Sequence, residues 1–137
     1  MKALGRHILA EVYGCDREVL NDPERVERIL VAAALESGAE VREVAFHQFS
    51  PQGVSGVVVI SESHLAVHTW PELGYAALDV FTCGDRVEPW DACNYIVERF
   101  RAQTVTATET KRGVFAEAEA QAEAEAQAEA EAQAEVG

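Results

Sequence analysis

Four strand-like segments follow one another between residues 40 and 83, and the turns between them are too short to hold a helix. Pro51-Gln52-Gly53 makes the first of these turns, and Pro71-Glu72-Leu73-Gly74 makes the last. Neighbouring parallel strands need a crossover of about a dozen residues or more. The spacing therefore predicts antiparallel strands, and it constrains the fold more than any other feature of the chain. The four segments are residues 40–49, 54–61, 65–70 and 75–83.

Two amphipathic helices flank these strands. Asp22 precedes Pro23, which suits a first helical position, and apolar residues then recur at helical spacing up to Gly38. Further strands at 4–13 and 104–111 complete the order β-α-β-β-β-β-α-β. This order predicts an α+β protein, a two-layer α/β sandwich whose antiparallel sheet carries both helices on one face. Pro89 begins the second helix, and its predicted inward face is Trp90, Cys93, Ile96, Val97 and Phe100.

The second face of that sheet has no predicted cover within the chain. The run Val57-Val58-Val59-Ile60 is apolar and β-branched, which is typical of a strand covered on both faces. A domain of roughly 113 residues also has a marginal core of its own. We therefore expect a second copy to pack on the open face and to give a four-layer αββα dimer.

Residues 116–137 differ in composition from the rest of the chain. They contain three copies of Ala-Glu-Ala-Glu-Ala-Gln followed by Ala-Glu-Val-Gly, and they hold seven of the 24 acids and no base. The net charge of −13 for the whole chain therefore falls to −6 for residues 1–115. Like charges four residues apart weaken a helix, and the repeat has no apolar face. We predict a domain over residues 1–115 and a tail that is disordered or transiently helical.

The composition argues against several classes of protein. A modestly acidic domain with no basic stripe is not typical of nucleic-acid binding. Cys15, Cys83 and Cys93 lack Cys-x-x-Cys spacing and suit neither a disulfide framework nor a zinc knuckle. Prolines and glycines break up the uncharged stretch 44–61, and charged residues interrupt any signal peptide near the start. We expect a cytoplasmic protein with no nucleic-acid or membrane partner.

Chemically reactive side chains are concentrated within 22 residues. Glu62-Ser63-His64 comes first, His68-Thr69-Trp70-Pro71-Glu72 follows, and Phe81-Thr82-Cys83-Gly84 comes last. A hydrolase elbow and a phosphate-binding loop are both missing from the sequence. His64 and His68 share one face of a strand, but no third ligand follows at motif spacing, so we predict no metal site.

This pattern resembles the small prokaryotic S-adenosylmethionine decarboxylases, enzymes that make their own pyruvoyl cofactor from an internal serine. The resemblance runs from Gly5-Arg6-His7 to about Arg112 and excludes the tail. The motifs that carry it are Gly53-Val54-Ser55-Gly56, Ser61-Glu62-Ser63-His64, His68-Thr69-Trp70-Pro71-Glu72 and Asp79-x-Phe81-Thr82-Cys83-Gly84.

The resemblance implies self-cleavage between Glu62 and Ser63, into a beta chain of residues 1–62 and an alpha chain of residues 63–137. Ser63 would attack the carbonyl of Glu62 to form an ester, and elimination would convert Ser63 into the pyruvoyl group. His68 would take the proton from Ser63 Cα, and Ser55 would assist the processing. The cofactor would therefore be the pyruvoyl group from Ser63, without a metal.

The resemblance also implies roles in turnover. The substrate amine would form a Schiff base with the pyruvoyl group, whose carbonyl accepts the electrons left by departing carbon dioxide. Cys83 would protonate the carbanion, because a thiol with a pKa near 8.5 is mostly protonated at neutral pH. Phe49 and Trp70 match positions that stack an adenine ring, and Glu72 matches the partner of the ribose hydroxyls.

The implied reaction converts S-adenosyl-L-methionine to S-adenosylmethioninamine, the aminopropyl donor for spermidine synthesis, in an assembly of two alpha and two beta chains. Two alternatives stay open. The same pyruvoyl chemistry could act on arginine or ornithine, although neither has a ring for Phe49 and Trp70 to stack. The chain could also be an inactive partner subunit, which the presence of Ser63, His68 and Cys83 argues against.

Overall fold

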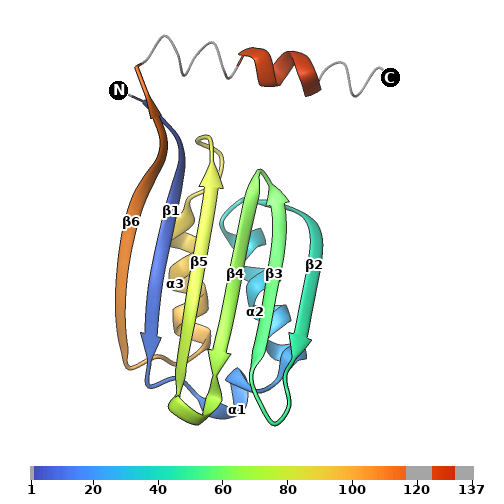
Figure 1. Ribbon diagram of the computed structural model, residues 1–137, viewed down its shortest axis with the longest axis vertical. Coiled ribbons are helices and arrows are strands. Elements are labelled where there is room, and N and C mark those ends of the chain that lie inside the picture. Colours follow the sequence, from blue (N-terminus) through green and yellow to red (C-terminus); the bar gives the residue numbers. More distant parts are fainter. Residues whose placement is uncertain (1, 117–124, 132–137) are drawn as a thin grey trace.

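A computed structural model of the chain describes residues 2–116 and 125–131 (Figure 1). Six strands form one sheet, and every neighbouring pair in it is antiparallel, in the spatial order β2-β3-β4-β5-β1-β6. The helices α2 and α3 lie side by side on one face of this sheet (Figure 1). The predicted α+β sandwich is therefore confirmed. The strands are β1 (Lys2–Tyr13), β2 (Glu40–Gln48), β3 (Val54–Ser61), β4 (Ser63–Trp70), β5 (Tyr75–Cys83) and β6 (Thr104–Phe115), and the helices are α1 (Arg17–Leu20), α2 (Pro23–Glu36), the 3-10 turn η1 (Pro71–Leu73) and α3 (Pro89–Arg99).

Several predicted boundaries move in the structure. β4 begins at Ser63 instead of Leu65, and β6 continues to Phe115 instead of Lys111. β6 is longer because it pairs with β1 as far as Lys2 opposite Phe115. The sequence analysis also missed α1, a single turn whose N-cap, Asp16, accepts hydrogen bonds from Glu18 and Val19. One turn of helix is too short to show hydrophobic periodicity.

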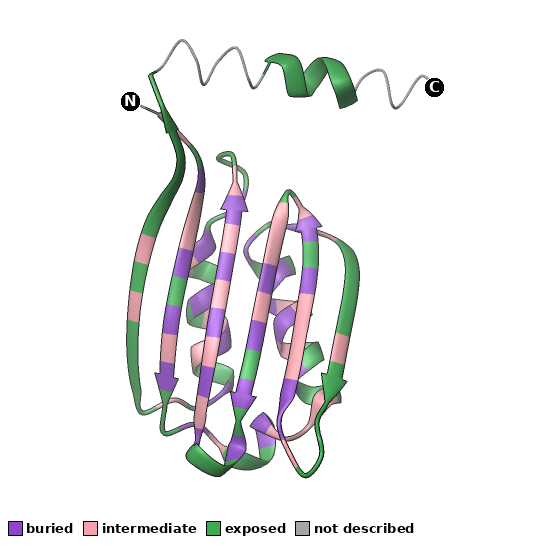
Figure 2. Cartoon of the chain, viewed as in Figure 1, coloured by how far each residue is buried: buried purple, intermediate pink, exposed green. Residues whose placement is uncertain are grey.

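The hydrophobic core lies between the sheet and the two long helices (Figure 2). Asp22 caps α2 as predicted, by accepting hydrogen bonds from the backbone N–H groups of Glu24 and Arg25. Of the predicted inward face of α3, Cys93, Ile96 and Phe100 are buried, whereas Trp90 and Val97 pack at the margin of the core. Ala92, which was not predicted, is fully buried.

No helix of the described residues, 2–116 and 125–131, lies on the opposite face of the sheet (Figure 1). Residues alternate along the strands between the core and this open face. On β4, Leu65, Val67 and Thr69 are buried, while His68 and Trp70 are exposed. In the single chain β3 is covered on one face only, and Val59 on the open face is 37% exposed. The prediction that β3 is covered on both faces therefore requires a second layer of protein on the open face, which the described residues of this chain do not supply.

Part of the tail is helical. Residues 125–131 form a short helix above one end of the sheet (Figure 1), and the Gln127 side-chain amide donates a 2.8 Å hydrogen bond to the Glu62 carboxylate. The prediction for the remaining residues of the repeat, 117–124 and 132–137, lies outside the described residues. No helix in the part of the chain that the structure describes is long and apolar enough to cross a membrane.

Candidate active site

β4 begins and β5 ends at the upper end of the sheet in Figure 1, and Ser63 meets Cys83 where these two strand ends lie side by side. Ser63 is the first residue of β4 and lies opposite Thr82 of β5, so Cys83, the last residue of β5, comes next to it. The Ser63 Oγ and Cys83 Sγ atoms are 3.2 Å apart, within hydrogen-bond distance for sulfur. The structure therefore brings together the predicted pyruvoyl precursor and the predicted proton donor.

The backbone at Ser63 is strained. Its φ angle is 113°, in a region that residues with a Cβ rarely adopt. Such conformations cost on the order of 1–3 kcal/mol and are concentrated at functional sites. The strain falls on the residue whose preceding peptide bond is the predicted cleavage site.

Ser55 and His68 form a second pair. They lie opposite each other on β3 and β4, and Ser55 Oγ is 2.7 Å from His68 Nδ1. The His68 ring is 6.4 Å from the Trp70 ring, which lies 5.2 Å from the ring of Tyr75. Ser55 is therefore placed to orient the His68 imidazole through a hydrogen bond.

The remaining predicted substrate residues lie at the same end of the sheet as His68. Phe49 follows β2 in the turn to β3, where its N–H donates to Gly53 O at 2.8 Å. Its ring is 49% exposed and meets His47 edge-on at 4.7 Å. Glu72 lies in η1, directly after Trp70, and is exposed.

The predicted site residues thus form two separate groups in one chain. Ser63 and His68 are five residues apart on the same strand, and a strand rises about 3.3 Å per residue, which places them roughly 16 Å apart. The structure brings Ser63 to Cys83 and Ser55 to His68. It does not bring His68 to Ser63 within one chain.

Two residues near Ser63 were missed by the sequence analysis. Thr82, opposite Ser63 in the sheet, is 1% exposed, and its hydroxyl has no hydrogen-bond partner among the described residues. His7 packs against Phe81, with 5.1 Å between ring centroids, and burial lowers the pKa of its imidazole. Both residues are brought near Ser63 by the pairing of neighbouring strands, and a local sequence motif does not reveal that pairing. The residues that the structure describes contain no group of three or more His, Cys, Asp or Glu side chains that could hold a metal.

A cavity of about 580 Å³ borders the Ser63 end of the site. Its lining carries both positive and negative charge, because arginine and glutamate side chains border it together with the Cys83 thiol. Arg42 Nε donates to Ser61 Oγ, directly before the predicted cleavage site. The lining residues are Glu40, Arg42, Ser61, Glu62, Cys83, Gly84, Arg86, Val87 and Glu131.

Three comparisons with known proteins match the same family. A family model described as S-adenosylmethionine decarboxylase matches residues 6–113. A protein of Acetivibrio thermocellus named S-adenosylmethionine decarboxylase proenzyme is 75% identical over 117 residues, which cover 85% of this chain and 94% of that protein. A protein of the same name from Clostridium tetani is 74% identical, with 85% and 93% covered. The crystal structure of the adenosylmethionine decarboxylase from Aquifex aeolicus superimposes with a TM-score of 0.81 at 35% identity, covering 85% of this chain and 97% of that one.

Proposed function

The chain belongs to the S-adenosylmethionine decarboxylase family, and we propose that it is a proenzyme that cleaves itself between Glu62 and Ser63 and then decarboxylates S-adenosylmethionine. The observation that carries the proposal is the strained Ser63, with φ 113° and its hydroxyl 3.2 Å from the Cys83 thiol. The family membership favours S-adenosylmethionine over the alternatives, arginine and ornithine. The paired Ser63 and Cys83 argue against an inactive partner subunit.

The maturation reaction begins at Ser63. Its hydroxyl oxygen attacks the carbonyl carbon of Glu62, the proton passes to the amide nitrogen, and the C–N bond breaks to leave an ester. A base then removes the proton from Ser63 Cα, the Cβ–O bond breaks, and Glu62 leaves with a new carboxylate. Hydrolysis of the resulting dehydroalanine releases ammonia and leaves the pyruvoyl group. The ester is less stable than the amide, so relief of the strain at Ser63 favours the first step.

His68 is the base of the proposal, and it acts across a dimer interface. Proton transfer needs heavy atoms about 3 Å apart or one bridging water, which a separation of roughly 16 Å along β4 excludes. The His68 side chain is exposed on the open face of the sheet. The Ser63 hydroxyl contacts Cys83, which belongs to the open-face row of β5, so His68 of the partner subunit can reach it if two open faces pack together.

A two-fold symmetric dimer fits the positions of Ser63 and His68 on β4. Packed sheets lie about 10 Å apart. A two-fold axis between the sheets, crossing β4 near Ala66, midway between Ser63 and His68, places each Ser63 opposite His68 of the partner subunit. Ala66 lies between Val57 of β3 and Asp79 of β5, and Val57 lies beside Ala45, so the apolar side chains near that axis are small and permit close packing. One axis then creates two equivalent sites, which is the assembly of two alpha and two beta chains.

The same arrangement divides the turnover roles. One subunit supplies Ser63 and Cys83, and its partner supplies Phe49, Trp70 and Glu72 to the same site. The exposed Phe49 and Trp70 rings can stack on an adenine and attract a sulfonium, and the Glu72 carboxylate can accept hydrogen bonds from ribose hydroxyls. The pyruvoyl group supplies a carbonyl that accepts electrons as carbon dioxide leaves. Cys83 holds the proton that is delivered to the substrate carbon.

Two measurements on purified protein test the proposal. An intact-mass spectrum is expected to show residues 1–62 and residues 63–137 as separate chains, the second beginning with a pyruvoyl group. Carbon dioxide release is then measured side by side from carboxyl-labelled S-adenosylmethionine, arginine and ornithine. Release from an amino acid alone would assign the chain to the alternative substrate. A single uncut chain with decarboxylase activity would exclude the pyruvoyl mechanism.

A further inference from the structure

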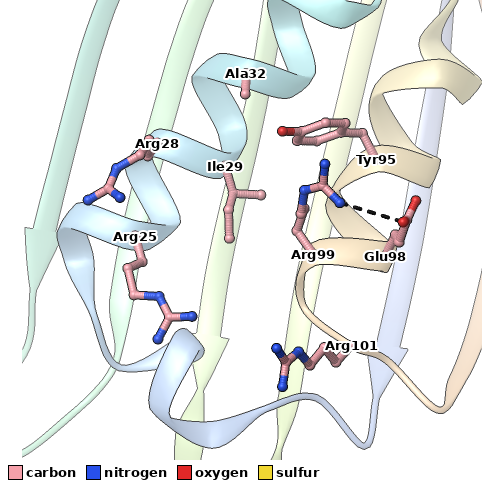
Figure 3. A pocket seen from close by; sticks show the side chains of 8 residues that line it. All are labelled: Arg25, Arg28, Ile29, Ala32, Tyr95, Glu98, Arg99 and Arg101. Carbon is pink, nitrogen blue, oxygen red and sulfur yellow. Dashed lines mark ion pairs between the residues drawn. The ribbon is translucent and has the colours of Figure 1, made fainter.

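A second cavity lies in the helix layer, on the side of the sheet opposite the candidate active site. It has a volume of about 630 Å³ and opens between α2 and α3 (Figure 3). Pockets of roughly 300–1,000 Å³ are the usual size for small-molecule ligands. The residues that line it are Arg25, Arg28, Ile29, Ala32, Tyr95, Glu98, Arg99 and Arg101.

The cavity concentrates positive charge in an acidic protein. Four of the eleven basic residues of the chain line it, against one acid, Glu98. Arg25 and Arg28 come from α2, whereas Arg99 and Arg101 come from the end of α3 and the residues after it. The fold therefore brings together two pairs of arginines that are more than seventy residues apart in the sequence, so a local sequence motif does not reveal the cluster.

The guanidinium groups keep donors that a ligand can use. Neither Arg25 nor Arg28 forms an ion pair with any residue in 2–116 or 125–131. Arg99 approaches Glu98 only to 3.5 Å, and Arg101 approaches Asp16 only to 3.8 Å. Exposed pairs at these distances contribute little and are easily exchanged for a better partner.

The shape of the cavity separates a charged part from an apolar part. Ile29 and Ala32 of α2 face Tyr95 of α3, and the Arg99 guanidinium lies 4.6 Å from the centre of the Tyr95 ring. Figure 3 shows the guanidinium groups of Arg25 and Arg101 beside the space below Ile29, whereas the Arg99 guanidinium lies next to the Tyr95 ring and Arg28 is turned away.

The backbone at one of these arginines is unusual. Arg101 has a φ of 56°, in the left-handed region. That conformation is uncommon for a residue with a Cβ, and it costs the chain about 1–2 kcal/mol. Arg101 therefore adds a strained position to the charged part of the cavity.

We propose that this cavity binds a small phosphate-bearing anion. A guanidinium group donates two parallel hydrogen bonds to phosphate oxygens, and arginines at both ends of the cavity can hold different phosphates of one chain. The apolar wall of Ile29, Ala32 and Tyr95 accommodates an organic part of the ligand, such as a nucleoside. Inorganic polyphosphate and nucleoside polyphosphates share the phosphate chemistry. They differ because only the nucleoside has an organic part that can pack on this apolar wall.

Isothermal titration calorimetry on the purified full-length protein tests the proposal, with sodium tripolyphosphate and ATP as separate probes without added divalent metal. Binding is expected for both and should weaken as salt is raised, because exposed charges are screened. Tighter binding of ATP would identify a nucleotide as the better ligand, and equal binding would identify inorganic polyphosphate. Loss of one charge-assisted contact predicts that Arg25→Gln and Arg99→Gln each weaken binding by about tenfold or more.

Arg28→Gln is the matched control. It removes the same charge from the same helix, but its guanidinium group turns away from the space that Arg25 and Arg101 border, so its effect should be smaller than that of Arg25→Gln. Self-cleavage should proceed normally in all three variants, which shows that they fold. Absence of binding to wild type, or equal affinity in wild type and Arg25→Gln, would overturn the proposal.

Discussion

Ser63 and His68 lie on one strand, β4, with roughly 16 Å between them. The two residues that the proposed maturation reaction needs together are therefore kept apart by the fold of the single chain. Each has a local partner instead, because Ser63 meets Cys83 and His68 meets Ser55. In the proposed mechanism, a complete site therefore requires a second subunit.

Mixed dimers of two inactive variants test this requirement. Ser63→Ala and His68→Ala should each remain uncut when expressed alone, because one lacks the nucleophile and the other lacks the base. When the two are co-expressed with different tags, a mixed dimer contains one complete site, formed by Ser63 of the His68→Ala chain and His68 of the Ser63→Ala chain. Intact-mass spectrometry is expected to show cleavage of the His68→Ala chain only.

The outcome separates the two possible locations of the base. If wild type cleaves and the mixed dimers do not, the base belongs to the same chain as Ser63 and the proposed interface is wrong. The Ser63→Ala chain serves as the internal control, since it lacks the nucleophile in every pairing and must stay whole.

Replacement of Cys83 should separate maturation from turnover. Cys83→Ala keeps Ser63 and His68, so it is expected to self-cleave. The largest effect expected on cleavage is a rate slower than that of wild type. Decarboxylation by the processed chain should fall by about 10²–10⁴-fold, the usual contribution of a general acid. Activity is measured per cleaved chain, so that slow processing is not counted as lost turnover. A processed Cys83→Ala enzyme with wild-type turnover would move the proton donor elsewhere.

Removal of the tail should change little. A hydrogen bond from Gln127 to Glu62 joins the tail to the domain, and both residues are exposed. An exposed hydrogen bond contributes about 0.5 kcal/mol or less, which corresponds to a change in Tm of about 2–3 °C for a domain of this size. Deletion of residues 116–137 is therefore expected to leave Tm and cleavage rate close to those of wild type. A decrease in Tm of many degrees would show that the repeat packs on the domain.

The Arg6 cluster should make stability depend on pH in acid. Arg6 donates hydrogen bonds to Glu88 at 2.9 Å and to Glu109 at 2.8 Å, and these contacts lower the pKa of both carboxyl groups below the ordinary value of 4.5. A lowered pKa in the folded state stabilises the fold above pH 4.5, and that stabilisation is lost as pH falls through the folded pKa values. Because Glu88 is about half exposed, the cluster contributes about 1 kcal/mol after screening by solvent.

Thermal unfolding of wild type and Arg6→Met measures this effect. At pH 7 the variant should melt about 4 °C lower, as expected for 1 kcal/mol in a domain of this size. The difference should shrink steadily below pH 4.5, as Glu88 and Glu109 become protonated. A difference that stays constant down to pH 3 would mean that Arg6 acts through packing and not through charge.

Local signals in the sequence were enough for most of the secondary structure. Asp22 and Pro23 mark the start of α2, and Pro89 marks the start of α3, because caps and prolines act on the residues beside them. β3 and β5 have their predicted bounds because turns at Pro51 and Gly74 limit them. The same local reasoning missed α1, whose single turn depends on the Asp16 cap and on contacts with its surroundings.

The sequence by itself determined which residues are candidates for the reaction, because Glu62, Ser63, His68 and Cys83 are close together in the chain and unusual in combination. Only the tertiary structure decided which of them meet. Strand register brings Cys83 to Ser63 across twenty residues, and the stiffness of an extended strand keeps His68 away from Ser63 across five. Proximity along the chain is therefore a poor guide to proximity in space once the residues lie on a strand, since each further residue adds about 3.3 Å of distance.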